Sequence, residues 1–257
     1  MPDPQLKDRV AIVTGGASGI GLAVAERFAA ENAKVVISDV NADGGNSAAK
    51  RLDALFVKTD LSRRDDCKAL VDRTVEAFGT VHILVNIAGY QHIDPIPDFP
   101  EDVWDNMIAV MLTAPFLLTR YAWPYMQAQR WGRIINMGSV HSKRASPFKA
   151  AYVSAKHGLL GLTRTTAREG GPYNILSHVI CPSYVRTPLV EKQIADQART
   201  RGIRPEQVLD QVFLAPTAVK RLVEPQEVAA LVRFLCTDEA SAMSGSAIAI
   251  DAGWMAG

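Results

Sequence analysis

The sequence predicts an α/β fold in which a doubly wound parallel sheet carries helices on both faces. Short apolar runs alternate with longer amphipathic segments, a pattern typical of strands joined by crossover helices. Several runs, such as Ile83-Leu84-Val85, are apolar throughout, as a strand buried on both faces requires. A glycine-rich stretch at 14–21 directly follows the apolar run Val10–Val13, where the first strand should turn into the first helix.

The expected elements follow in chain order from these patterns. The apolar runs expected to form strands are Arg9–Thr14, Lys34–Asp39, Leu55–Thr59, His82–Ile87, Arg133–Gly138, Leu176–Cys181 and Ala247–Asp251. The amphipathic segments expected to form helices are Gly19–Glu31, Ala42–Leu52, Arg63–Phe78, Glu101–Gln129, Ala150–Gly170 and Gln226–Thr237. No repeat, low-complexity tract or linker separates them, so residues 1–257 are expected to form a single domain. The charged segment 187–223 stands apart, and it is either a mobile lid over a site or a surface excursion.

The bulk composition excludes several classes of partner. The chain is 48% apolar and 21% charged, which suits an ordinary core, and its net charge of +1 gives no case for nucleic-acid or membrane-surface binding. The 3 cysteines lie far apart without a CxxC spacing, so reduced thiols and no metal site are expected. Neither a signal peptide nor a membrane-spanning stretch is recognised, which favours a cytoplasmic protein. A mitochondrial matrix enzyme whose presequence had been trimmed would look the same.

The first candidate site is the glycine-rich turn. Gly15, Gly19 and Gly21 permit a tight turn and a close approach of phosphate oxygens to the first turn of a helix, although the same residues also suit a plain strand–helix turn. Asp39 ends the second expected strand, where its carboxylate can accept hydrogen bonds from a ribose 2′-hydroxyl and would repel a 2′-phosphate. This favours NAD over NADP. The alternative is that Asp39 caps the helix expected to begin at Ala42.

The second candidate site is the pair Tyr152 and Lys156. Four residues apart on an expected helix, they share one face. A fixed ammonium beside a phenol stabilises the phenolate and lowers the tyrosine pKa, which makes the tyrosine usable as a proton acceptor. The spacing alone is a frequent accident, and it becomes specific only together with the glycine-rich turn.

These features stand in one order with further short motifs. The order is the glycine turn, Asp39, Asp60-Leu61, Asn86-Ile87-Ala88-Gly89, Ser139 and the Tyr152/Lys156 pair. With this order the chain resembles the short-chain dehydrogenase/reductase family over essentially its whole length. The resemblance implies a single Rossmann-like domain with a seven-stranded parallel sheet, a nicotinamide cofactor and a homotetramer.

The resemblance also implies roles for individual residues. Tyr152 would take the hydroxyl proton as hydride leaves, Lys156 would lower its pKa and hold the nicotinamide ribose, and Ser139 would hydrogen-bond the substrate oxygen. The residues that it places around the cofactor are Gly15, Ser18, Gly19, Ile20, Gly21, Asp39, Asp60, Leu61, Asn86, Ala88, Gly89, Tyr152, Lys156, Pro182, Val185 and Thr187.

A closer resemblance concerns the substrate pocket. It rests on Gly89-Tyr90-Gln91-His92, Ser139-Val140-His141, Lys149-Ala150-Ala151-Tyr152, Val185–Gln193 and Gly253-Trp254. These stretches are similar to (R)-3-hydroxybutyrate dehydrogenases, enzymes of ketone-body metabolism. The residues implied to hold a short 3-hydroxy carboxylate or its keto acid are Gln91, Ser139, His141, Lys149, Tyr152, Gln193 and Trp254. Outside the resemblance, Lys149 and the two glutamines would equally suit the surface, His141 a loop, and Trp254 plain packing.

One position departs from the family pattern. The family has a catalytic asparagine in its long central helix, and alignment on Trp104-Asp105 places Met111 there. Asn106 would lie about 140° away around a regular helix, a poor substitute. Pro115 lacks an amide, so the Met111 carbonyl should lose its helical partner and a kink is expected. In the family, the backbone carbonyl at this position helps to hold a water that links the lysine to solvent. We interpret Met111 as keeping this carbonyl and losing the asparagine side chain. The alternatives are that the alignment is off by one residue or that methionine simply packs the core.

Other activities of the same fold remain open at this point. A sugar-alcohol dehydrogenase or a 3-oxoacyl carrier-protein reductase would use the same catalytic residues, although Asp39 and the small net charge argue mildly against the latter. A non-catalytic NAD-binding sensor is suggested only by Met111.

Overall fold

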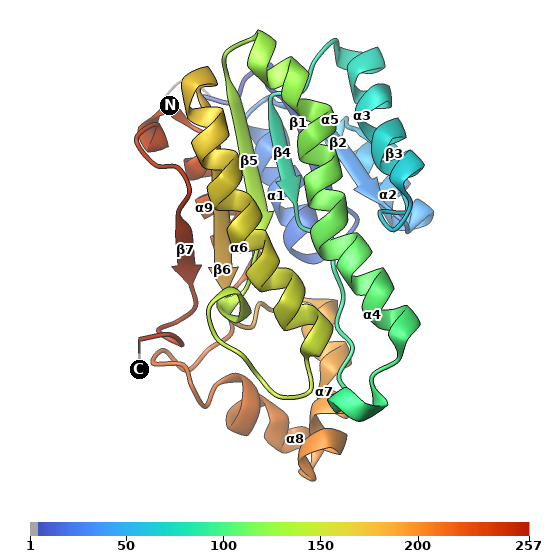
Figure 1. The fold of residues 1–257 in the computed structure, drawn as a ribbon, viewed down its shortest axis with the longest axis vertical. Helices are drawn as coiled ribbons and strands as arrows, with labels where there is room; N and C mark the ends of the chain where they lie inside the picture. The colour runs from blue at the N-terminus through green and yellow to red at the C-terminus, as the bar shows by residue number, and fades with distance from the viewer. Residues whose placement is uncertain (1–4, 257) are drawn as a thin grey trace.

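The computed structural model describes residues 5–256 and builds them around a parallel seven-stranded sheet (Figure 1). The strands are β1 Val10–Thr14, β2 Lys34–Asp39, β3 Leu55–Lys58, β4 Ile83–Asn86, β5 Gly132–Met137, β6 Ile175–Pro182 and β7 Ala247–Ile250. Their order is β3-β2-β1-β4-β5-β6-β7, and every neighbouring pair is parallel. The predicted doubly wound α/β fold is therefore confirmed.

Helices cover both faces of this sheet. They are α1 Gly19–Ala30, α2 Ala42–Leu52, α3 Arg64–Phe78, α4 Glu101–Ile108, α5 Ala114–Ala128, α6 Ala150–Gly170, α7 Pro188–Arg201, α8 Pro205–Val208 and α9 Pro225–Leu235. Successive strand residues point to opposite faces, so Val13 packs in the core under α1, α2 and α9, whereas Ile12 packs in the core under α3 and α5. Both cores are apolar because the central strands are buried on both sides. None of the helices in the described part of the chain is long and apolar enough to cross a bilayer.

The long central helix is interrupted where an irregularity was predicted. Helices α4 and α5 are joined by a π-helical turn, Ala109–Thr113, in which the amide of Ala114 bonds the carbonyl of Ala109. Pro115 has no amide for the carbonyl four residues back, and the helix accommodates this loss by bonding i to i+5 over one turn. The irregularity expected at Pro115 thus takes the form of a π turn. The 140° offset assumed for Asn106 was calculated for a regular helix and does not hold across this turn.

The segment 187–223 forms a small helical layer with its own core. It contains α7, α8 and a second π-helical turn, Leu209–Phe213, and its buried side chains include those of Val190 and Phe213. Figure 1 shows α7 and α8 beyond the end of the sheet towards which the strand arrows point. A single parallel bridge between Val185 and Val223 closes its base. This layer therefore lies over the carboxyl ends of the strands, where ligands bind in open parallel sheets.

Candidate active site

The carboxyl ends of the strands open onto a cavity of about 470 Å³. At one end of it, β1 passes into α1 through the glycine-rich turn. A Cβ on Gly21 would lie 2.1 Å from the carbonyl oxygen of Gly15, so only glycine fits there. Ser18 is the N-cap of α1, and its side chain makes no capping hydrogen bond, which leaves amides of the first turn without a side-chain partner. This open helix N-terminus fits a pyrophosphate.

Asp39 lines the same end of the cavity at the carboxyl end of β2. Its Oδ2 accepts a hydrogen bond from the amide of Ala17, 3.1 Å away, and its Oδ1 accepts one from the amide of Asn41, 3.0 Å away. The N-cap of α2 is Asn41, which accepts from Gly44, so the alternative role of Asp39 as a helix cap is wrong. The two amides fix the carboxylate beside the glycine-rich turn.

The predicted catalytic residues meet in the middle of the cavity. Tyr152 and Lys156 lie in α6, and Ser139 follows β5. The ammonium of Lys156 donates to the carbonyl of Met137 over 2.6 Å and lies 5.3 Å from the centre of the Tyr152 ring. Lys156 is therefore held by the end of β5, on the tyrosine side of the cavity.

The protein's own groups do not by themselves lower the pKa of Tyr152. Burial raises it to about 12, and a hydrogen bond with Ser139 opposes this only in part. Burial also lowers the pKa of Lys156 to about 8, so this lysine still carries its proton at neutral pH. Desolvation therefore outweighs the lowering of the tyrosine pKa expected from the ammonium neighbour; the charge of oxidised nicotinamide was expected to contribute as well.

A buried cation marks the other end of the cavity. Lys149 is only 2% exposed, and burial, with a smaller contribution from Arg201, lowers its pKa to about 8. Its ammonium donates to the hydroxyl of Tyr184 over 3.4 Å and lies 5.4 Å from that ring, which stacks on Phe213. The cation points to an anionic ligand, because an unpaired buried charge is costly.

Polar side chains from three other segments line the cavity near this cation. Gln91 and Gln193 each have a buried Oε1 that lacks a protein partner among residues 5–256. His141 lies with Nδ1 3.1 Å from the carbonyl of Arg144, and burial lowers its pKa to about 4, so its ring is neutral. Two amides, one imidazole and one ammonium can together bind a small carboxylate.

The structure brings all but two of the predicted site residues to the wall of the cavity. Asn86 lies behind it and donates to Asn136 over 2.8 Å, which joins β4 to β5. Trp254 lies behind His141, with their rings 6.0 Å apart and edge to face, and His141 in turn packs edge to face on Tyr152. Trp254 therefore supports a wall of the pocket and does not itself line it.

Sequence reasoning missed several residues that line the cavity, among them Tyr184 and Asn106. Tyr184 lies between Pro182 and Val185, both predicted to contact the cofactor, and its place in that segment was the available signal. Asn106 also lines the cavity, and its Oδ1 accepts a hydrogen bond of 2.7 Å from the hydroxyl of Tyr90. No sequence pattern pairs these two side chains, which come from different segments.

Met111 is buried rather than exposed to the cavity. It is 1% exposed and packs in an apolar cluster that includes Met107, Ala151 and Ala155, with Tyr152 at its edge. Its position next to the cavity is set by Gly89, where a Cβ would meet the Met111 sulfur at 3.0 Å. The side chain fills space and offers no amide to the catalytic residues.

Comparison with known proteins places this geometry in a family. A family profile described as enoyl-(acyl carrier protein) reductase matches residues 15–255. The chain is 42% identical to a D-beta-hydroxybutyrate dehydrogenase of Rhizobium meliloti (strain 1021), over 96% of this chain and 99% of that protein. It is 38% identical to one of Cupriavidus necator, over 98% of this chain and 99% of that protein. The crystal structure of levodione reductase superposes with a TM-score of 0.90 at 33% identity, covering 98% of this chain and 99% of the other.

The chain belongs to the short-chain dehydrogenase/reductase family. It is accordingly an oxidoreductase whose family uses a nicotinamide cofactor, as the sequence resemblance predicted. Among residues 5–256 no three histidine, cysteine or carboxylate side chains are grouped so that they could hold a metal ion.

Proposed function

We propose that this protein transfers a hydride between NAD and a short 3-hydroxy carboxylate, of which (R)-3-hydroxybutyrate and acetoacetate are the first pair to test. The observation that carries the proposal is the buried cation Lys149 in the same cavity as Tyr152 and Ser139. A carboxylate on Lys149 would direct the hydroxyl-bearing end of a short acid towards the phenol. The similarity to two D-beta-hydroxybutyrate dehydrogenases supports the same substrate class.

In this proposal Tyr152 accepts the hydroxyl proton of the substrate. Ser139 donates a hydrogen bond to the substrate oxygen and steadies its developing charge, while the Tyr152 oxygen accepts the proton. Because burial raises the pKa of Tyr152 to about 12, ionisation needs positive charge nearby. The ammonium of Lys156 supplies part of that charge. NAD, when bound, supplies the hydride acceptor and a second positive charge.

The cofactor would lie between the glycine-rich turn and Lys156. The first turn of α1 would bind the pyrophosphate, and Asp39 would accept hydrogen bonds from the adenosine ribose. A 2′-phosphate would face the Asp39 carboxylate, which supports NAD rather than NADP as the cofactor. Asp60 and Leu61 line the cavity where the adenine would lie.

Two other functions are kept as alternatives. A 3-oxoacyl carrier-protein reductase is favoured by one observation, namely that the matching family profile is described by an acyl-carrier-protein substrate. A sugar-alcohol dehydrogenase of the same fold is the other enzyme alternative. A non-catalytic NAD sensor would explain Met111 in place of the family asparagine. The intact set of Ser139, Tyr152 and Lys156 in one cavity favours an enzyme over a sensor.

One screen separates these functions. NADH absorbance is followed with (R)- and (S)-3-hydroxybutyrate, longer 3-hydroxy acids and sorbitol-type polyols, with NAD and NADP in parallel, and 3-oxoacyl thioesters are offered in the reverse direction. The proposal expects oxidation of the (R) acid with NAD to be fastest. A polyol or a thioester with a higher kcat/KM would replace it with an alternative function, and NAD binding without turnover of any compound would favour the sensor.

We further propose that residues 1–257 act as one cytoplasmic domain, that 187–223 is its substrate lid and that the protein is a homotetramer. Four of the residues that line the cavity, Pro188, Leu189, Val190 and Gln193, belong to α7, which supports the role of the segment as a lid. Light scattering coupled to size exclusion tests the tetramer directly.

A further inference from the structure

Three separate segments each supply one residue of the proposed carboxylate pocket. Gln91 lies in the loop 87–95 after β4, Lys149 ends the loop 138–149 before α6, and Gln193 lies on α7. These segments are far apart in sequence, so their side chains can bind one small anion only if the segments are fixed against each other. Asp94 makes a contact with each of the other two segments.

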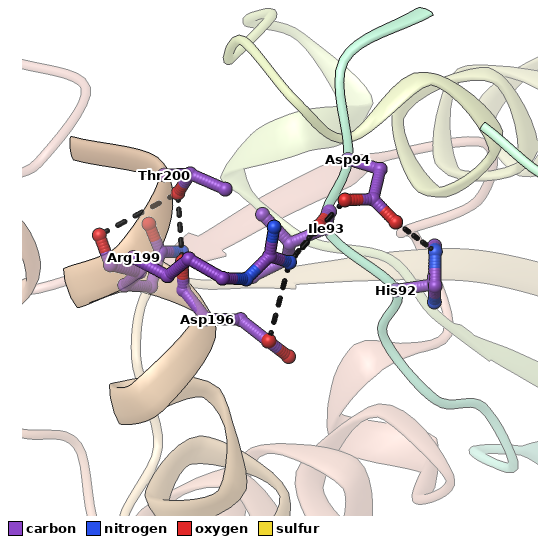
Figure 2. Close-up of polar contacts among 7 residues, drawn as sticks. His92, Ile93, Asp94, Asp196, Arg199 and Thr200 are labelled. Atoms are coloured by element: carbon purple, nitrogen blue, oxygen red, sulfur yellow. Dashed lines mark hydrogen bonds and ion pairs between the residues drawn. The ribbon is translucent and has the colours of Figure 1, made fainter. Parts of the chain in front are cut away.

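The carboxylate of Asp94 joins its own loop to α7 (Figure 2). Its Oδ1 accepts a hydrogen bond of 3.2 Å from Nη2 of Arg199, which also donates to the carbonyl of Ile93 over 3.2 Å and to Asp196 over 3.4 Å. Its Oδ2 lies 2.6 Å from Nε2 of His92, which carries the proton because a carboxylate only accepts. Both oxygens are thereby engaged, and the Asp94 side chain is only 20% exposed.

The backbone of Asp94 joins the same loop to the segment that ends at Lys149. Its amide donates to the carbonyl of Phe148 over 3.1 Å. Phe148 has a φ of 67°, a left-handed conformation that a bulky residue adopts only when its surroundings hold it there. The guanidinium of Arg201 lies 5.9 Å from the Phe148 ring, within the range of a cation–π contact. The residue directly before Lys149 is thus held by both Asp94 and α7.

The contact at Arg199 also fixes the position of Gln193 along the lid. Both lie on α7, Pro188–Arg201, and a helix of this length moves as one body. Gln197, between them, is fully buried, and its Oε1 accepts from Nε of Arg201 over 3.0 Å. Holding the C-terminal end of α7 against residues 93–94 therefore restricts the amide of Gln193 as well.

We propose that Asp94, with Arg199 as its partner, is a positioning residue that assembles the carboxylate end of the pocket. Neither side chain lines the cavity, so neither is expected to touch the substrate. The inference rests on the proposed function only in assigning a carboxylate to Gln91, Lys149 and Gln193. Loss of the pair should loosen the acid-binding end and leave the nucleotide-binding end unchanged.

The kinetic test compares Asp94→Asn and Arg199→Gln with Arg51→Gln, which breaks the exposed ion pair between Arg51 on α2 and Glu26 on α1. Asp94→Asn and Arg199→Gln should each raise KM for (R)-3-hydroxybutyrate by roughly two- to five-fold, with KM for NAD unchanged. The double variant should be no worse than the poorer single variant, because both remove one interaction. Arg199→Lys should recover much of the loss, and Arg51→Gln should match the unaltered enzyme.

A second test does not depend on turnover. Hydrogen–deuterium exchange of the amides in α7 should be faster in Asp94→Asn than in the unaltered protein, and unchanged in Arg51→Gln. The backbone hydrogen bond from Asp94 to Phe148 is kept in this variant. Unchanged exchange in Asp94→Asn would overturn the proposal even if another substrate is found. Faster exchange with an unchanged KM would give Asp94 a structural role only and would also overturn it. If the unaltered enzyme oxidises no hydroxy acid, the proposed function fails while the exchange result still decides whether Asp94 holds these segments together.

Discussion

Replacing Lys149 by methionine should stabilise the fold while it weakens substrate binding. Burial lowers the pKa of Lys149 from 10.5 to about 8. The folded protein therefore binds this proton less tightly than the unfolded chain does, and the difference destabilises the folded state by about 3 kcal/mol. The cost is complete below about pH 8 and disappears as the pH rises through 10.5. Methionine has a similar shape and no charge to desolvate.

The same change removes the cation from the proposed carboxylate site. A hydrogen bond to a charged group contributes about 1.5 to 3 kcal/mol, so KM for the hydroxy acid should rise by about 10- to 150-fold. The Tm at pH 7 should rise by roughly 6 to 12 °C, because 1 kcal/mol shifts the Tm of a protein of this size by about 2 to 4 °C. The assays are thermal unfolding and NADH absorbance on the same preparation.

Lys143→Met is the matched control for this experiment. Lys143 lies in the same loop, is exposed and donates only a long hydrogen bond of 3.4 Å to the carbonyl of Ala247. Its replacement should change neither the KM nor the Tm appreciably. A lower Tm in Lys149→Met would refute the burial argument, and an unchanged KM would refute the assignment of this lysine to the carboxylate.

The remaining predictions concern pH and two single residues. KM for the hydroxy acid should rise as the pH passes the lowered Lys149 pKa of about 8, because the ammonium loses its proton there, and a flat profile would count against a charged pocket. Met111→Asn should raise kcat because it restores the family's amide, and it should lower the Tm because the amide is placed at a site that is 1% exposed. Met111→Leu should change neither kcat nor the Tm. A loss of turnover in the asparagine variant would show that methionine suits this enzyme. Asp39→Ser should lower the preference of kcat/KM for NAD over NADP by about tenfold, and an unchanged ratio would remove Asp39 from cofactor selection.

The sheet could be read from the sequence almost residue by residue. Strands β1 and β4 contain the continuous apolar runs Val10–Val13 and Ile83–Val85, and burial on both faces of a parallel sheet permits little else. The predicted strand ends differ from the observed ones by no more than one residue. The bounds of the helix Pro188–Arg201 were not predicted, because few of its side chains are apolar and pack in a core.

The residues of the candidate site were predictable from sequence only where the local backbone geometry permits few residue types or spacings. Gly21 is fixed by the backbone that it touches, and the spacing of Tyr152 and Lys156 follows from one helix. The π turn beside Met111 required knowing how the helix responds to a proline. The contact of Asp94 with Arg199 joins residues 105 positions apart, and no local sequence pattern predicts it.

Tyr152→Phe most directly tests whether the phenol is the proton acceptor. The variant keeps the ring that packs against His141 and loses only the hydroxyl. We expect kcat for oxidation of the hydroxy acid to fall by about 10²- to 10⁴-fold, the usual contribution of a positioned acid or base, while NADH binding measured by fluorescence titration stays intact. Oxidation by this variant at the rate of the unaltered enzyme would contradict the account.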